Sequence, residues 1–199
     1  SLKTESISFH ASYRYFRLTC SDEKWDLMEN DFKKSIEICK EHNGEFLVLH
    51  TNEGLPGEVM DKGILEKRIQ KLIKLGKEKE VKVVIENVGI GKNILYNQEE
   101  YIELIKKYNF DSLIDIGHAI ANNWDLDKVI TELKENIIAY HFHNNDGEKD
   151  LHKSIYDGKA DYERIISLVK ENTPEANIVL EYSTATPKRE ILETLEKLS

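Results

Sequence analysis

Six short apolar runs, each four to seven residues long, alternate along the chain with longer segments that mix apolar and charged residues. Continuous apolar runs of this length are typical of strands that are buried on both faces of a parallel sheet. We therefore expect strands at Ile7–His10, Phe46–His50, Val81–Glu86, Ser112–Asp115, Ile137–His143 and Asn177–Glu181.

The longer segments repeat apolar residues at steps of three and four, which is the pattern of an amphipathic helix. Met28, Phe32, Ile36 and Cys39 give the clearest example. Alternation of strands and helices predicts an α/β fold with a parallel sheet covered by helices. We expect helices at Trp25–Lys40, Ile64–Lys79, Gln98–Lys107, Asp125–Asn136, Asp161–Glu171 and Lys188–Leu198.

Two architectures fit this alternation, an open doubly wound sheet and a closed barrel. An open dinucleotide-binding sheet needs a glycine-rich turn after a strand, and Gly89-Ile90-Gly91 has the wrong spacing for it. The barrel is favoured, because each of the six strands ends with a potential metal ligand, a His, an Asp or a Glu. We expect one domain over residues 1–199, a TIM barrel of the (β/α)8 type in which six strands are recognised.

The strand ends carry histidines and carboxylates, and the carboxyl ends of barrel strands open onto one face. Imidazole nitrogens and carboxylate oxygens together suit Zn²⁺, Mn²⁺, Fe²⁺ or Co²⁺. Asp115 and His118 share a face if the chain turns at Gly117, while His141 and His143 share one by strand spacing. Of these two histidines, one is expected to bind metal, and the other to contact substrate or line the pocket. The strand-end residues and those directly after them are His10, His50, Glu86, Asp115, His118, His141, His143, Asp150, His152 and Glu181.

Composition narrows the classes of function. The 199 residues contain 28 Lys+Arg and 37 Asp+Glu, a net charge of −9, which argues against binding nucleic acid or an anionic membrane. No apolar run approaches membrane-spanning length, and the start has no signal-peptide core. Cys20 and Cys39 are too few for a disulfide framework, so a cytoplasmic location is expected.

Seven segments, in this order, resemble the xylose isomerase-like TIM-barrel superfamily, which includes sugar isomerases and epimerases and endonuclease IV-type AP endonucleases. They cover nearly the whole chain. Each segment alone is a weak signal, and it is the seven in this order that are specific for the superfamily. The segments are His10-Ala11-Ser12-Tyr13, Leu47-Val48-Leu49-His50, Val84-Ile85-Glu86-Asn87, Leu113-Ile114-Asp115-Ile116-Gly117-His118-Ala119, His141-Phe142-His143-Asn144-Asn145, Asp150-Leu151-His152 and Val179-Leu180-Glu181.

The epimerase branch of the resemblance implies one divalent ion, Zn²⁺, Mn²⁺, Co²⁺ or Mg²⁺, held by Glu86, Asp115, His141 and Glu181. Glu86 and Glu181 would also be the catalytic acid/base pair, acting on a sugar or sugar phosphate beside its carbonyl. The endonuclease branch implies three zinc ions, with ligands at His10, His50, Glu86, Asp115, His118, His141, Asp150, His152 and Glu181.

Three departures favour the isomerase or epimerase. The endonuclease pattern His-Pro-Gly is His50-Thr51-Asn52-Glu53 here, Asp-Thr-Cys-His is Asp115-Ile116-Gly117-His118, and His-Leu-Asn-Asp is His141-Phe142-His143-Asn144. A zinc phosphodiesterase acting on abasic DNA and a non-catalytic sugar-binding member remain as alternatives.

Further residues are expected at the substrate. His118, His143, Tyr13, Trp124 and Lys153 are the candidates, while a packed Tyr13, a helix-start anchor at Trp124 and a solvated Lys153 are the structural alternatives. The resemblance starts at the third strand of the family, which implies that the first two βα units are missing from this sequence. Whether the chain forms a homo-oligomer stays open. Ser1-Leu2 is interpreted as a cloning remnant.

Overall fold

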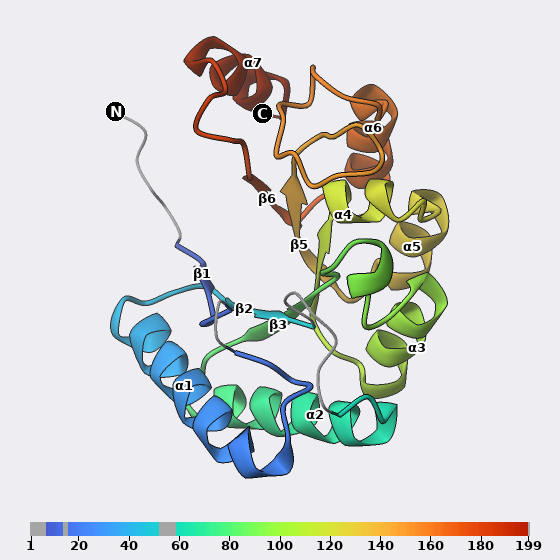
Figure 1. Ribbon diagram of the computed structural model, residues 1–199. Coiled ribbons are helices and arrows are strands. Elements are labelled where there is room, and N and C mark those ends of the chain that lie inside the picture. The colour runs from blue at the N-terminus through green and yellow to red at the C-terminus, as the bar shows by residue number, and fades with distance from the viewer. Residues whose placement is uncertain (1–6, 14–15, 52–58, 199) are drawn as a thin grey trace. The chain divides into compact units, whose positions relative to one another are not determined.

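The structure is a computed structural model that describes residues 7–13, 16–51 and 59–198. Its contacts divide the chain into two compact units, Ser1–Glu86 and Asn87–Ser199. In each unit, the described residues form three strands joined by helices (Figure 1). The expected cloning remnant, Ser1-Leu2, lies outside the described residues.

In the first unit, β1 (Phe9–His10), β2 (Leu47–His50) and β3 (Val83–Glu86) pair in chain order and run parallel. Helix α1 (Asp22–Glu41) connects β1 to β2, and α2 (Lys62–Glu78) connects β2 to β3. Strand β2 pairs with β3 over its whole length, so that His50 stands opposite Glu86. The last residues of two adjacent strands are therefore direct neighbours.

The apolar faces of α1 and α2 form the core of the first unit with the strands. Phe32 and Ile36 of α1 are buried, as are Leu65, Ile69 and Leu72 of α2. The two helices contact each other, and α2 also contacts β3. Burial at steps of three and four confirms the predicted amphipathic pattern.

A buried arginine holds the segment that leads into α1. Arg68 of α2 donates hydrogen bonds to the carbonyl oxygens of Leu18 and Cys20 and, over 2.7 Å, to Oδ1 of Asp22. Its guanidinium also lies 4.6 Å from the centre of the Trp25 ring. Arginine suits this position because its planar fork satisfies several acceptors at once.

In the second unit, β4 (Ser112–Asp115), β5 (Ile137–Phe142) and β6 (Asn177–Leu180) are parallel and pair in chain order. Helices α3 and α5 contact each other, as do α5 and α6, and Figure 1 shows these three in succession beside the strands. The helical elements are the 3₁₀ helix η1 (Gly91–Asn93), α3 (Gln98–Tyr108), α4 (Ile116–Ala121), α5 (Leu126–Leu133), α6 (Tyr162–Asn172) and α7 (Lys188–Leu198).

A register shift between Ser112 and Leu113 decides which side chain of β5 lies beside the end of β4. Because of this shift, Asp115 stands opposite His141, whereas an unshifted ladder would place it opposite Tyr140. Successive residues of a strand point to opposite faces, so a shift of one residue exchanges an imidazole for a phenol.

Several helices begin at an Asp or Asn whose side chain accepts a hydrogen bond from the backbone N–H three residues further on. Asp61, Asn97, Asp125 and Asp161 cap α2, α3, α5 and α6 in this way. Asp115 does the same for α4, so one residue ends a strand and caps a helix. These residue types are the preferred N-caps, because the side-chain oxygen satisfies an otherwise unpaired N–H.

The predicted strands and helices are all present in the described part of the chain, with small differences at their ends. Strand β1 begins at Phe9 rather than Ile7, β5 ends at Phe142, and the helix expected over Asp125–Asn136 ends at Leu133. Helix α4 was not predicted.

The structure also bears on two predictions from composition. Cys20 and Cys39 are buried thiols. Across residues 7–13, 16–51 and 59–198, the helices are too short or too polar to cross a bilayer.

Candidate metal centre

The strands of the first unit bring together three of the predicted residues. Nδ1 of His10 lies 3.0 Å from Nε2 of His50, and the same nitrogen of His50 lies 3.0 Å from Oε2 of Glu86. Glu86 is buried and His10 is exposed. The ring of Tyr13 stacks on that of His50, with 5.2 Å between the centroids. We call His10, His50 and Glu86 the first-unit group.

The strand ends of the second unit bring together another set, which we call the Asp115 group. Nδ1 of His141 lies 3.3 Å from Oε1 of Glu181 and 3.7 Å from Oδ2 of Asp115. Asp115 and His141 are buried, and the side chain of Glu181 is 24% exposed. One imidazole nitrogen thus faces two carboxylate oxygens.

Asp150, His118 and His152 form the Asp150 group of the same unit. Oδ2 of Asp150 lies 3.3 Å from Nε2 of His118 and 3.2 Å from Nε2 of His152. Nδ1 of His118 lies 3.0 Å from the carbonyl oxygen of Asn87, and Nδ1 of His152 lies 2.9 Å from that of Glu181. A carbonyl oxygen only accepts, so in both rings Nδ1 carries the proton that it donates. Nε2 of each ring faces an oxygen of Asp150 and donates to it, and a bound ion would replace that proton and use the lone pair of Nε2.

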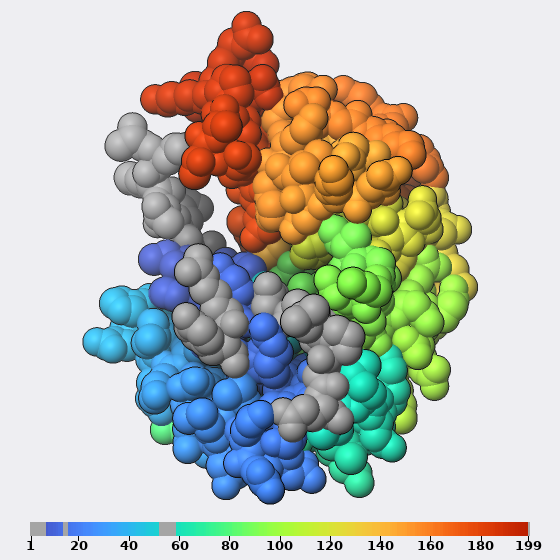
Figure 2. All heavy atoms as spheres, viewed as in Figure 1, coloured from blue at the N-terminus to red at the C-terminus, as the bar shows by residue number. Residues whose placement is uncertain are grey.

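The Asp150 group depends on the loop between β5 and α6, which Figure 2 shows in orange at the surface of the second unit. Asn144 holds this loop, because its side chain donates to the carbonyl oxygen of Ile155 and accepts from the N–H of Ala160. The side chain of Asn145 donates to the carbonyl oxygen of Gly117 in α4. These two asparagines therefore position Asp150 and His152, a role that the sequence analysis did not assign.

Asn87 is a second residue that the sequence analysis quoted without a role. Its side chain accepts from the N–H of Asp115 over 2.7 Å and donates to the carbonyl oxygen of Asp115 over 3.0 Å. With the bond from His118 to its own carbonyl, Asn87 supports two candidate ligands at once. The sequence signal that could have identified Asn87 is its position directly after Glu86, the glutamate that ends a strand.

Asp115 and His118 do share a site, but the turn expected at Gly117 is wrong. Strand β4 ends at Asp115, and α4 begins at once, so Gly117 is a helical residue. Oδ1 of Asp115 accepts from the backbone N–H of His118 over 2.7 Å. The two side chains meet because Asp115 caps the helix that contains His118, and no unusual glycine conformation is needed.

Electrostatics favours charged carboxylates in the second unit. Burial raises the pKa of Asp115, but the charges of His118 and His143 and hydrogen bonds from neighbouring imidazoles outweigh it, so that the pKa lies well below its usual value. Burial is likewise outweighed at Asp150, where His118 and His152 lower the pKa. The hydrogen bond to Asp150 raises the pKa of His152 to about 9.

Pair separations in the second unit are close to those of metal ligands, and among its described residues the sets of three whose ligand atoms all lie within 4.8 Å of one another are Asp115, His118 and His143, and His143, His152 and Glu181. Zinc ligands bound at about 2.1 Å in a tetrahedron lie about 3.4 Å apart. The separations within the Asp115 group are 3.3 and 3.7 Å, and those from Asp150 to its two histidines are 3.3 and 3.2 Å. Nitrogen and carboxylate donors of this kind suit zinc and manganese. His50 in the first unit has the same 3.0 Å spacing to each of its two neighbours.

Two further predicted substrate contacts have neighbours within the protein. The ring of Trp124 packs against Tyr101 with 5.6 Å between centroids. Nζ of Lys153 lies 3.1 Å from Oδ1 of Asp157. Of the departures from the endonuclease pattern, Asn52 and Glu53 lie outside the described residues.

Residues 3–199 match the family described as xylose isomerase-like TIM barrel. The chain belongs to this family, which confirms the resemblance and the predicted fold class. The described residues hold six strands of that fold.

A curated relative is the uncharacterized protein MJ1311 of Methanocaldococcus jannaschii. It is 24% identical over 152 residues, a match that covers 73% of this chain and 50% of the relative. The chain therefore spans about half the length of this relative.

Similar folds are found among solved structures. One, a D-tagatose 3-epimerase-like protein, has a TM-score of 0.79 and 21% identity, with 97% of this chain and 75% of that one covered. Another, the IOLI protein with a bound zinc atom, has a TM-score of 0.74 and 16% identity, with 96% and 74% covered. At these identities the likeness is one of fold.

Proposed function

We propose that this protein is a divalent-metal-dependent isomerase or epimerase of a sugar or sugar phosphate. The observation that carries the proposal is the Asp115 group, in which Nδ1 of His141 lies 3.3 Å from Glu181 and 3.7 Å from Asp115 at the ends of consecutive strands. Two similar folds, a D-tagatose 3-epimerase-like protein and a zinc-bound IOLI protein, support it.

In the proposed site, Glu86, Asp115, His141 and Glu181 hold one ion, Zn²⁺, Mn²⁺, Co²⁺ or Mg²⁺. Glu86 joins this set on the strength of the family resemblance. When bound, the ion supplies electrostatic stabilisation for the negative charge that develops on a substrate oxygen during proton transfer.

The residues of the chain carry the proton. Glu86 and Glu181 are the proposed acid/base pair, one removing a carbon-bound proton beside the carbonyl and the other returning it. The contact with His141 orients Glu181, while its partly exposed carboxylate stays accessible to a ligand. His118 and Tyr13 are the proposed contacts to sugar hydroxyls, Trp124 to a sugar face and Lys153 to a phosphate.

The test follows incorporation of deuterium from heavy water into a panel of ketoses, aldoses and their phosphates, with the metal-loaded protein and NMR detection. Glu86→Gln and Glu181→Gln, assayed at saturating metal, should each lower the exchange rate at least about 100-fold. Glu175→Gln, an exposed site in the turn before β6, is the matched control and should retain the rate. Sugars that gain no deuterium, or a retained rate in either active-site variant, would contradict the proposal.

A zinc phosphodiesterase is the second candidate, and the Asp150 group favours it specifically. Both of its histidines direct Nε2 at one carboxylate oxygen. The endonuclease branch of the family resemblance adds His10, His50 and Glu86 as ligands. The net charge of −9 weighs against a nucleic acid substrate. Zinc-replete protein that incises an abasic duplex, and stops when a chelator is added, would favour this candidate. Sugar binding without exchange would favour a non-catalytic member.

The remaining parts of the proposal concern the location of the protein in the cell and its partners. We keep a cytoplasmic location and the absence of membrane and nucleic-acid partners as proposals from composition. Homo-oligomerisation remains open.

A further inference from the structure

His143 stands outside the ligand set of the proposed function, yet it lies within hydrogen-bond distance of the Asp115 carboxylate. Its Nε2 lies 3.0 Å from Oδ1 and 3.1 Å from Oδ2 of that carboxylate. The residue is fully buried, with 0% of its surface exposed. A side chain this deep is poorly placed to contact a substrate, which was one expectation for it.

Nε2 of His143 bridges the two oxygens of Asp115, and the backbone N–H of His118 distinguishes them. Oδ1 accepts from this N–H over 2.7 Å. Oδ2 is the oxygen that faces His141, whose Nδ1 is 3.7 Å away. Since Nε2 of His143 faces a carboxylate, it carries the proton and donates it. The imidazole therefore restricts the carboxylate by contacting both oxygens, while the N–H of His118 holds Oδ1 and leaves Oδ2 turned toward His141.

The opposite nitrogen of the same ring is unusual. Nδ1 of His143 is buried and has no hydrogen-bond partner among the residues that the structure describes. Buried polar atoms without partners are rare and costly, so a ring that only filled space would be replaced by an apolar one at little loss. The bond from Nε2 to Asp115 is what distinguishes the imidazole from an apolar side chain here.

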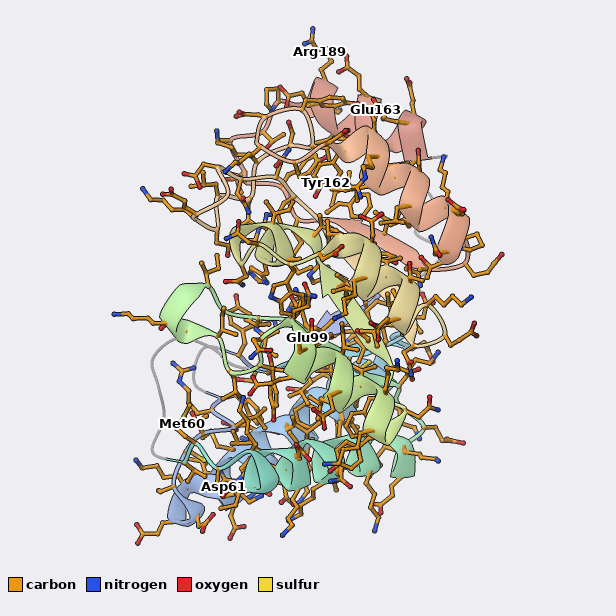
Figure 3. All side chains as sticks on the ribbon, turned by 90° about the vertical axis from the view of Figure 1, so that its right-hand side faces the viewer. Met60, Asp61, Glu99, Tyr162, Glu163 and Arg189 are labelled. Carbon is orange, nitrogen blue, oxygen red and sulfur yellow. The ribbon has the colours of Figure 1, made fainter. Side chains whose placement is uncertain are left out.

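Gly117 leaves the space that the imidazole ring of His143 occupies. A Cβ atom on Gly117 would lie 1.9 Å from Cε1 of His143 and 2.4 Å from each ring nitrogen. The other face of the ring stacks on His152, with 4.2 Å between centroids. The hydroxyl of Tyr162, labelled in Figure 3, donates to the carbonyl oxygen of His143 over 2.7 Å. The ring is thus confined from several directions, and only a residue without a side chain fits at position 117.

We infer that His143 is a positioning residue for the metal ligand Asp115, and that Gly117 is required because its missing side chain leaves room for the imidazole. The inference rests on the metal site of the proposed function. It assigns His143 neither a ligand bond nor a contact with substrate. Groups that orient a ligand in this way commonly change metal affinity about 10- to 100-fold.

The test compares two variants, His143→Gln and His143→Asn, whose side-chain amides differ in length by one methylene group. His143→Gln places its amide nitrogen near the position of Nε2 and retains a donor for Asp115, whereas the shorter side chain of His143→Asn does not reach it. The affinity of the metal-free protein for Mn²⁺ and Zn²⁺ is measured by competition with a chromophoric chelator. His143→Asn should bind about 10- to 100-fold more weakly than the wild type, and His143→Gln within about threefold of it. His42→Gln, an exposed histidine at the end of α1, is the control and should bind as the wild type does.

Gly117→Ala tests the same inference without changing the histidine. Alanine is the better helix former, so helix propensity alone predicts a protein that is at least as stable and binds metal normally. Displacement of the ring predicts an affinity about 10- to 100-fold lower. Circular dichroism at the temperature of the titration identifies variants that fail to fold. If both amide variants fail to fold, the metal affinity of Gly117→Ala tests the inference.

Equal affinities for His143→Asn and His143→Gln, or an unchanged affinity in Gly117→Ala, would overturn the inference. A wild-type protein that binds neither ion would overturn it together with the proposed function. Wild-type protein that binds metal and shows no sugar exchange would contradict the proposed function alone, because the affinity ratios would still support the role of His143.

Discussion

Nδ1 of His141 lies 3.3 Å from Oε1 of Glu181, at the ends of two adjacent parallel strands. The register explains this contact. His141 pairs with Val179, and Glu181 follows two residues later, so its side chain points to the same face. The contact is therefore built into the pairing of β5 with β6, and the binding of a cation between two such groups should stabilise the folded state.

Addition of a divalent ion should raise the melting temperature, because the ion binds the folded protein. At an ion concentration about 100 times the Kd, the gain is about 2.7 kcal/mol, or about 5–10 °C for a chain of this size. Differential scanning calorimetry of metal-free protein with and without Mn²⁺ measures it. In His141→Ala the shift should disappear, while His42→Ala should retain it. An equal shift in both variants would place the ion elsewhere.

Asp150→Asn separates the two candidate functions. A single ion in the Asp115 group predicts the same number of bound ions in wild type and variant. Three zinc ions predict the loss of one, because Asp150 is the carboxylate that both His118 and His152 approach. Elemental analysis after zinc loading and gel filtration gives the count. A lower count in the variant would contradict the single-ion site.

Replacement of Arg68 should strongly destabilise the first unit. Arg68→Lys replaces the planar fork by a shorter, single ammonium group that does not satisfy all of its buried acceptors, which should lower the free energy of unfolding by about 2–4 kcal/mol. Urea denaturation measures the change. Arg164→Lys, at an exposed pair with Asp127, should cost less than about 1 kcal/mol. Similar costs for the two variants would show that the carbonyl contacts of Arg68 contribute little.

Glu29 should contribute to stability in a pH-dependent way. Burial raises the pKa of this carboxyl, but hydrogen bonds from Lys33 and Lys71 outweigh it, and the pKa lies below the usual 4.5. A pKa lowered by folding means that the contribution is present above the unfolded value and is lost as the pH falls through the folded value.

The stability difference between wild type and Glu29→Gln should therefore be largest at about pH 6 and should shrink below about pH 4. Urea denaturation at both pH values measures it. Glu41→Gln, in the exposed last turn of α1, is the control and should change the free energy by less than about 0.5 kcal/mol. A difference for Glu29→Gln that grows toward low pH would contradict this assignment.

Much of the fold was predictable because its signals are local. The run from Ser112 to Asp115 begins and ends with a polar residue and forms β4 with the predicted bounds. Helix α4 was missed because it follows that strand without a loop, and Asp115 was considered only as a possible ligand. Asp is also a preferred N-cap, so the same residue carried the signal for the helix start.

The candidate site was predictable only in part, since sequence order does not specify which side chains meet. The alternation rule placed His141 and His143 on one face, and both do approach Asp115. That Gly117 leaves room for the ring of His143 depends on packing between α4 and the residue that follows β5, and spacing alone does not contain that information. The register shift at Ser112 is equally invisible in a hydrophobic pattern.

The central claim is tested most directly by the metal content of the purified protein. The protein is loaded with Zn²⁺ or Mn²⁺, passed through a gel-filtration column and analysed by elemental mass spectrometry. The account predicts about one retained ion per chain, lost in His141→Ala and kept in His42→Ala. A wild-type protein that retains no ion, or a His141→Ala variant that retains as much as the wild type, would contradict it.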